Sequence, residues 1–286
     1  MRKLDTRIAW GLALAALLAG APAGATEFTL SDLNASLTVE TTDATCGVGS
    51  SCGVSNWVVD GTDQLFEQWF WVRGGSGPEA PIHSLGLVGE QASDTNPLDD
   101  LADDTLALRY SDGSLQIDLT LGLRGTDPGD GISVLREDIT LTNLTGGFLT
   151  ISFFQYADFD MDGTSGGDTV QILNGNKAVQ FGDLGSVSET VATPPPNLVQ
   201  AALFSTIRSA LSDGDLDNLS GATGPVGPGD ATWAFQWTAT LNAGQELQIS
   251  KVKRIVVPEP ATAALLGAGL LGLVVAGRRR PARGQG

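Results

Sequence analysis

The residues best suited to chemistry in this 286-residue chain form a short acidic segment. Aspartates stand at positions 158, 160 and 162, Gly163 follows them, and Asp168 comes a little later. Carboxylates at alternate positions before a glycine are typical of loops that wrap a calcium ion, because the glycine permits a sharp turn that brings the oxygens together. The spacing therefore predicts a calcium site formed by Asp158, Asp160, Asp162 and Asp168.

The acidic segment departs from the loop of EF-hand proteins, which closes with a bidentate glutamate at position twelve. Here position twelve is Thr169, and Asp168 falls one residue short. Residues 149–156, which precede the segment, have the pattern of a strand and not of a helix. Two interpretations therefore stand side by side: a calcium loop in a β-sheet context, and a solvated acidic loop after a strand.

Catalytic residues are harder to find, and we assign none. The chain has one histidine, His83, which a Ser-His-Asp site would have to use and which we expect in a loop. Glu67 lies among the aromatic residues 66–71 and is the first choice for the carboxylate of a glycoside hydrolase. An outward-facing position on an amphipathic strand is the simpler interpretation of Glu67.

Tryptophans offer a second kind of binding chemistry, since flat apolar rings can stack on sugars. The five in question are Trp57, Trp69, Trp71, Trp233 and Trp237. Aromatic residues in strands usually fill the interior, so we expect these rings in the core.

Short strand-like segments must position these residues. They cover residues 28–40, 65–72, 105–110, 115–123, 134–143, 149–156, 233–241 and 246–257. Gly- and Asp-rich breaks separate them, and Asp112-Gly113 suits a tight hairpin turn. Many short strands with turn residues between them predict an all-β protein with an antiparallel β-sandwich. Residues 198–211 fit a helix and a strand about equally.

The N-terminus has the pattern of a secretory signal peptide over residues 1–25. Basic residues precede the apolar stretch 8–19, and Ala23 and Ala25 flank a glycine as a small-x-small cleavage site. We therefore expect export and a mature chain that starts near Thr26.

The C-terminal segment, residues 258–286, has three parts. Val257 leads into Pro258, Glu259 and Pro260; an apolar stretch follows over 263–277; and Arg278, Arg279 and Arg280 come after it. The apolar stretch is long enough for a short transmembrane helix, and the arginines should remain cytoplasmic. This arrangement resembles the PEP-CTERM sorting signal of biofilm-forming bacteria. The resemblance implies an exosortase as the processing partner and the membrane as a transient or permanent anchor.

Charge and cysteines describe the domain between the two targeting segments, residues 26–257. It has 9 basic and 31 acidic residues, a net charge of −22, which disfavours nucleic acid and anionic lipid as partners. Cys46 and Cys52 are the only cysteines, and in an exported protein we expect them to form a disulfide.

These observations lead to one functional hypothesis and one alternative. The hypothesis is an exported, envelope-sorted, non-enzymatic structural or adhesive component of the extracellular polysaccharide matrix, stabilised by calcium. The alternative is a secreted hydrolase that acts on polysaccharide.

Overall fold

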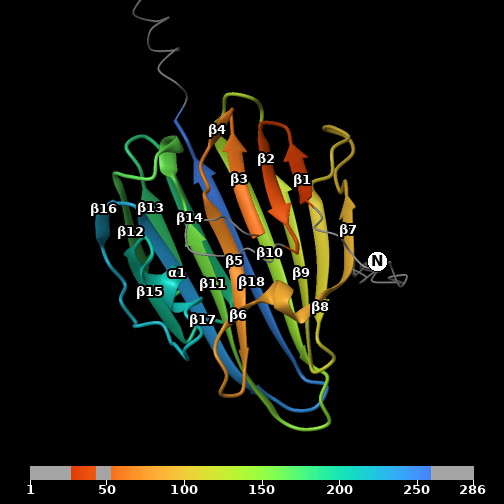
Figure 1. The fold of residues 1–286 in the computed structure, drawn as a ribbon. Helices are drawn as coiled ribbons and strands as arrows, with labels where there is room; N and C mark the ends of the chain where they lie inside the picture. The colour runs from red at the N-terminus through yellow and green to blue at the C-terminus, as the bar shows by residue number, and fades with distance from the viewer. Residues whose placement is uncertain (1–26, 43–52, 259–286) are drawn as a thin grey trace, which may run out of the picture.

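The computed structural model describes residues 27–42 and 53–258, which form two facing β-sheets (Figure 1). Sheet A contains, in spatial order, β1 (Glu27–Asp32), β2 (Ala35–Glu40), β3 (Gly53–Val59), β5 (Glu67–Gly74), β11 (Leu149–Asp158), β17 (Ala231–Leu241) and β15 (Leu198–Leu203), with β4 (Thr62–Asp63) beside β3 and β6 (Ala80–Pro81) beside β5.

Sheet B contains, in spatial order, β16 (Val226–Gly229), β12 (Asp168–Leu173), β13 (Lys177–Phe181), β14 (Ser186–Thr193), β18 (Glu246–Val256), β10 (Ile132–Asn143), β9 (Leu115–Arg124), β8 (Thr105–Ser111) and β7 (Leu87–Ser93). Neighbouring strands are antiparallel, except for a short parallel contact between β3 and β5. The predicted all-β antiparallel sandwich is confirmed.

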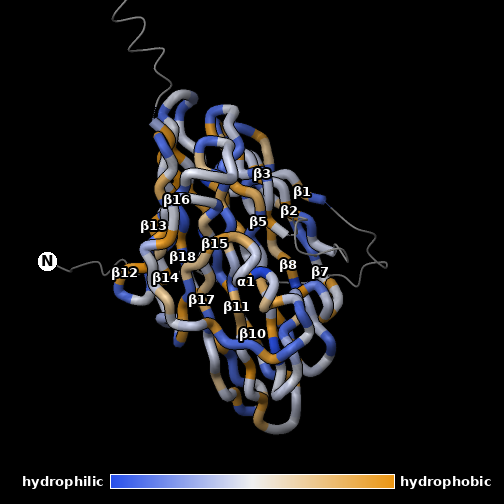
Figure 2. The backbone as a smooth tube through the Cα atoms, turned by 60° about the vertical axis from the view of Figure 1, so that its left-hand side comes forward, coloured by the Kyte–Doolittle hydropathy of each residue, from blue (hydrophilic) through white to orange (hydrophobic). Residues whose placement is uncertain are grey.

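Alternation of apolar and polar residues explains why these segments form strands. In β9, Leu115, Ile117, Leu119 and Leu121 are buried, and the residues between them are partly or fully exposed. Hydrophobic and hydrophilic segments alternate in the same way along other strands (Figure 2). The hairpin predicted around Asp112-Gly113 is present, since β8 and β9 pair in register from Thr105–Gly122 to Ser111–Gln116.

Two segments differ from a simple sequence interpretation. Residues 28–40 alternate like one strand but form the hairpin of β1 and β2, because Leu33 at the turn adopts a positive φ of 50°. The ambiguous segment 198–211 contains both elements, since β15 is followed by the short helix α1 (Thr206–Ala210). Two 3₁₀ turns complete the structure, η1 (Ile82–Leu85) and η2 (Met161–Gly163).

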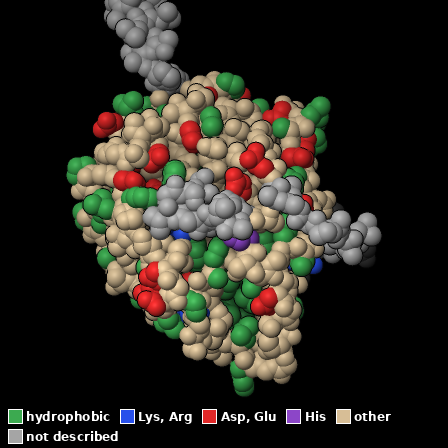
Figure 3. Space-filling view, viewed as in Figure 1, with side chains coloured by type: hydrophobic (Ala, Val, Ile, Leu, Met, Phe, Trp, Pro, Cys, Tyr) green, Lys and Arg blue, Asp and Glu red, His purple; other side chains and the backbone are tan. Residues whose placement is uncertain are grey.

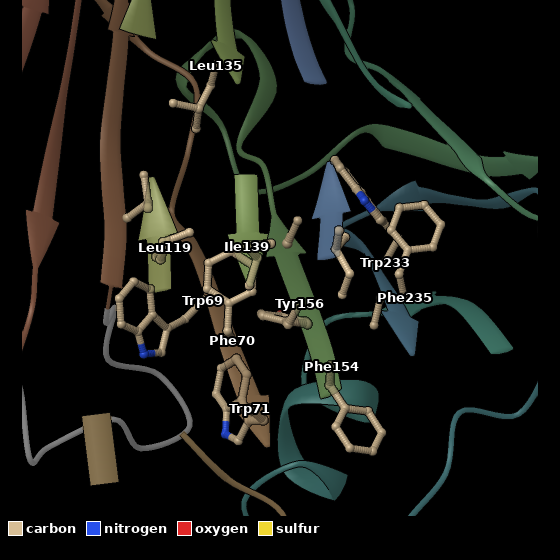
Figure 4. Packing of buried hydrophobic residues seen from close by; sticks show 14 of the residues in the cluster. Trp69, Phe70, Trp71, Leu119, Leu135, Ile139, Phe154, Tyr156, Trp233 and Phe235 are labelled. Carbon is tan, nitrogen blue, oxygen red and sulfur yellow. The ribbon is translucent and has the colours of Figure 1, made fainter. Parts of the chain in front are cut away.

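Aromatic side chains dominate the buried parts of both faces of sheet A (Figure 4). Between the sheets, the rings of Phe70 and Phe153 stack with centroids 5.5 Å apart, and those of Phe159 and Trp233 stack at 5.3 Å. All five tryptophans considered above have exposed fractions of 1% or less. The expectation that they are buried is therefore confirmed, and none of them presents a surface on which a sugar can stack.

Within residues 27–42 and 53–258, no helix has the length and apolarity to cross a bilayer.

Candidate functional site

Helix α1 packs near β15 and β17 on the outer face of sheet A, which points away from sheet B. Arg208 on this helix donates a hydrogen bond from Nε to Oε2 of Glu67, at the start of β5, over 2.9 Å. Both side chains are at most 1% exposed. The guanidinium also lies over the ring of Trp71, 4.7 Å from its centroid. Glu67 therefore lies on the outward face, as expected, but in a buried ion pair beneath α1.

A second arginine extends this arrangement along β5. Arg73 forms an ion pair with Glu79 and donates from Nη2 to Oδ1 of Asn218 over 2.8 Å. Its guanidinium carbon is 5.5 Å from the ring centroid of Phe154 on β11. Two buried arginines thus fasten α1 and the loop after it onto sheet A.

Three carboxylates converge at the end of sheet A that carries Glu67. Asp158 ends β11, Asp160 follows it, and Asp230 directly precedes β17. The antiparallel register of β11 and β17 brings the two strand ends together, and Asp158 pairs with Thr232. One carboxylate oxygen from each of the three aspartates lies within 4.8 Å of the others. We call Asp158, Asp160 and Asp230 the acidic cluster.

The acidic cluster contains a buried oxygen without a hydrogen-bond partner. Asp158 is 1% exposed, and its Oδ2 accepts a hydrogen bond from the hydroxyl of Tyr156 over 3.0 Å. Its Oδ1 is buried and has no described partner, and the same is true of Oδ1 of Asp230. A buried carboxylate oxygen without a donor costs free energy unless a proton or a cation satisfies it.

The pKa values of the acidic cluster are raised because of this cost. Burial, reinforced by the charge of Asp230, raises the pKa of Asp158 to about 8. Burial and the charges of Asp230 and Asp63 raise the pKa of Asp160 to about 6. Neighbouring carboxylates in a site of low solvation cannot all be ionised without a counter-charge. The cluster therefore either retains protons near neutral pH or binds a cation through oxygen ligands.

The other two aspartates of the sequence motif have different surroundings. Asp162 accepts hydrogen bonds from the backbone N–H groups of Leu184 and Gly185 over 2.7 and 2.9 Å. A Cβ atom at position 185 would lie 2.9 Å from the Asp162 carboxylate, so a glycine permits this close approach. Asp168 accepts from the side chain of Gln180 over 2.7 Å. Of the four aspartates in the motif, Asp158 and Asp160 lie in the acidic cluster, and Asp230 joins them from the position directly before β17.

A second charged group, which we did not predict from the sequence, lies between the two sheets. It consists of Glu137 on β10, Glu189 on β14, and Lys251 and Lys253 on β18, and we call it the interlayer quartet. Lys253 Nζ lies 2.6 Å from Glu137 Oε2, and both lysines lie 3.1 Å from Glu189 Oε1. All four side chains are completely buried.

Sheet A completes the surroundings of the interlayer quartet. Gln68 on β5 donates to Glu137 Oε1 over 2.7 Å, and the indole of Trp233 on β17 donates to Glu189 over 2.8 Å. Burial alone would raise the pKa of Glu137, but the charges of Lys251 and Lys253 reverse this effect and lower it to about 2. The quartet has no net charge and links both sheets, which indicates a structural role.

His83 lies in η1, where its Nδ1 accepts a hydrogen bond from the indole of Trp69 over 3.2 Å.

Several predicted residues lie outside the described residues: Ala23 and Ala25 of the signal cleavage site, Cys46 and Cys52 of the disulfide, and Glu259, Pro260, Arg278, Arg279 and Arg280 of the tail.

Solved structures share the fold of this chain. A putative aldose 1-epimerase from Escherichia coli K12 matches with a TM-score of 0.54 and 11% identity, over 82% of this chain and 100% of that one. A bacterial glucoamylase complexed with acarbose matches with a TM-score of 0.52 and 11% identity, over 88% of this chain. The matching part is 37% of the glucoamylase, so this chain spans little more than a third of it. At such identities, the likeness is one of fold.

The sorting signal is found by comparison with protein families. Residues 256–280 match the PEP-CTERM protein-sorting motif. The chain therefore carries a signal for export and sorting at the envelope, which begins at the last residue of β18. Among curated proteins, none matches the sequence.

Proposed function

We propose that this protein is a non-enzymatic structural or adhesive component of the extracellular polysaccharide matrix, delivered by its sorting signal. The observation that carries the proposal is the PEP-CTERM motif at residues 256–280, which begins at the last residue of the final strand of the sandwich. An exosortase is the processing partner that the motif implies. The names of the two fold relatives, an aldose epimerase and a glucoamylase, support an association with carbohydrate by analogy of fold alone.

The state of Glu67 favours a non-enzymatic role over the hydrolase alternative. A general acid or nucleophile in glycoside cleavage must reach the scissile bond. Glu67 is 1% exposed and bonded to Arg208 beneath α1, so catalysis would require this ion pair to open. The same cover buries Trp71.

Calcium is the cofactor that suits the acidic cluster. Asp158, Asp160 and Asp230 supply oxygen ligands at one point, and Oδ1 of Asp158 is buried without a hydrogen-bond partner. Calcium prefers carboxylate oxygens and accepts irregular ligand geometry. A bound cation would neutralise the repulsion among the three carboxylates and fasten the ends of β11 and β17 together.

The first test is the intact mass of the protein recovered from its native envelope. We expect a chain that begins near Thr26, ends near the Pro-Glu-Pro segment, and lacks two hydrogens because Cys46 and Cys52 are joined. A mass that still includes the tail would indicate a permanently anchored membrane protein and not a released or relinked matrix component. Release of reducing ends from envelope polysaccharide would instead support the hydrolase.

A further inference from the structure

Basic side chains are distributed very unevenly over the described residues. Four of them, Arg73, Arg208, Lys251 and Lys253, lie in the buried ion pairs described above. The remaining five, Arg109, Arg124, Arg136, Lys177 and Arg254, all lie on the outer face of sheet B. The opposite side of the molecule, viewed from α1 and β6, displays many acidic side chains (Figure 3).

Three of these arginines surround one residue. The register pairs Val134 on β10 with Arg124 on β9 and with Arg254 on β18, and Arg136 follows on the same face of β10. All three arginines are exposed. Arg136 is paired with Asp138, whereas the described structure gives the guanidinium groups of Arg124 and Arg254 no acidic partner. We call Arg124, Arg136 and Arg254 the arginine triad.

A groove of about 440 Å³ opens beside the arginine triad. Its lining combines Arg124 and Arg136 with hydroxyl and aliphatic groups, which come from Thr95, Thr105, Thr120, Val134 and Val252. A second hollow of about 320 Å³ continues along the sheet and shares Thr120 and Asp138 with the first. In the second hollow Arg109 is outnumbered by Asp118, Asp138 and Glu246, so the positively charged lining is confined to the groove beside the arginine triad.

We propose that this groove binds an acidic polysaccharide of the matrix, with uronic acid carboxylates on the arginine triad. Guanidinium groups hold carboxylates through charge-assisted hydrogen bonds. The hydroxyl of Thr120 can pair with a sugar hydroxyl, whereas those of Thr95 and Thr105 already donate to Asp104 and can only accept. The side chains of Val134 and Val252 can contact the C–H face of a sugar ring. The inference rests on the proposed matrix function and gives it a ligand class and a binding surface.

The large negative charge of the domain does not prevent this contact. The Debye length is about 8 Å at physiological ionic strength, so a bound chain responds mainly to the charges close to it. On the outer face of sheet B, the five basic side chains outnumber the acidic ones, Asp118, Asp138 and Glu246. The strand residues of this face therefore carry a local excess of positive charge, in contrast to the domain as a whole.

The experiment measures the affinity of the protein, in the form recovered from its native envelope, for polygalacturonate and for neutral dextran. We expect binding to polygalacturonate only, weaker at high salt. Replacement of the triad by glutamine, Arg124→Gln with Arg136→Gln and Arg254→Gln, should weaken it at least about tenfold, because three charge-assisted contacts are lost. A control changes the net charge equally outside the groove: Ser114→Asp with Ser165→Asp and Ser220→Asp, all at exposed positions.

The outcomes separate the inference from the proposed function. Equal loss of affinity in the triad variant and the control would overturn the inference, because net charge alone would then govern binding. Equal binding to dextran would also overturn it, and so would tighter binding to single-stranded DNA or to phosphatidylglycerol vesicles. If the triad variant kept wild-type affinity for polygalacturonate and was still retained in the matrix, the inference about this groove would be wrong. The proposed matrix function would be unaffected.

Discussion

Glu137 and Asp138 are consecutive residues of β10, yet their carboxylates lie on opposite faces of sheet B. Glu137 is completely buried in the interlayer quartet, where it contacts Lys251 and Lys253. Asp138 faces solvent, is 43% exposed, and pairs with Arg136 on its own strand. The two neighbours therefore allow a direct comparison of a buried and an exposed ion pair in one strand.

Loss of the Glu137 charge should destabilise the fold strongly. Glu137→Gln leaves two buried lysines with one carboxylate, and removal of one partner from a buried ionic network typically costs about 3 kcal/mol or more. Asp138→Asn removes an exposed pair and should change the free energy of unfolding by no more than about 1 kcal/mol. Urea unfolding of both variants measures the difference. Similar values for the two would contradict a stabilising balance of charges in the quartet.

The same substitution should change how stability depends on pH. The folded-state pKa of Glu137 is lowered to about 2 from its usual 4.5, so ionised Glu137 stabilises the folded state. This contribution is complete above pH 4.5 and is lost as the pH falls toward 2. The stability gap between the wild type and Glu137→Gln should therefore narrow across this acid range. A gap that stays constant would mean that Glu137 does not titrate in the expected direction.

Calcium should raise the melting temperature of the wild-type protein relative to a chelator, because a ligand that binds only the folded state stabilises it. Asp158→Asn, Asp160→Asn and Asp230→Asn should each reduce the shift. Asp162→Asn is the matched control, since the Asp162 carboxylate accepts the backbone N–H groups of residues 184 and 185. An equal melting temperature with calcium and with chelator would remove the calcium proposal. If Asp162→Asn also abolished the calcium-dependent rise in melting temperature, the calcium ligands would instead be the four aspartates of the sequence motif.

Glu67→Gln tests structure and catalysis together. It leaves the buried guanidinium of Arg208 without its carboxylate, so we expect a loss of about 3 kcal/mol in unfolding free energy. Wild-type protein should show no turnover across a panel of polysaccharides. If turnover appears and Glu67→Gln abolishes it while the variant remains folded by circular dichroism, the hydrolase alternative would replace the matrix proposal.

The fold could be predicted from local patterns because many strands have their own alternation of apolar and polar residues and are bounded by turn residues. Leu115, Ile117 and Leu119 indicated both the strand and its buried face, and Asp112-Gly113 located the hairpin. Residues 28–40 were harder, because the apolar alternation continues across the turn at Leu33.

The acidic cluster and the interlayer quartet were harder to predict, because their residues come from strands that are distant in sequence. Asp230 lies far along the chain from Asp158, and only the register of β11 and β17 brings the two together. The interlayer quartet did leave a local signal: Lys251 and Lys253 occupy the same alternating positions as the buried residues Ile249 and Ile255. Charged residues in the apolar phase of a strand predict burial, but their partners on β10 and β14 become visible only in the folded sheet.

The strand that leads into the sorting signal lies in the middle of its sheet. β18 is paired on one side with β14 and on the other with β10, and just beyond it Val257 donates a hydrogen bond to the carbonyl of Gly131 over 2.7 Å. A side chain at Gly131 would place its Cβ 1.7 Å from the Val257 carbonyl oxygen. A force applied along the axis of β18 at Val256 would act on two hydrogen-bond ladders at once, because β10 and β14 pair with both edges of the strand. The last strand before the sorting signal is therefore fastened on both of its edges, not at a free edge of the sheet.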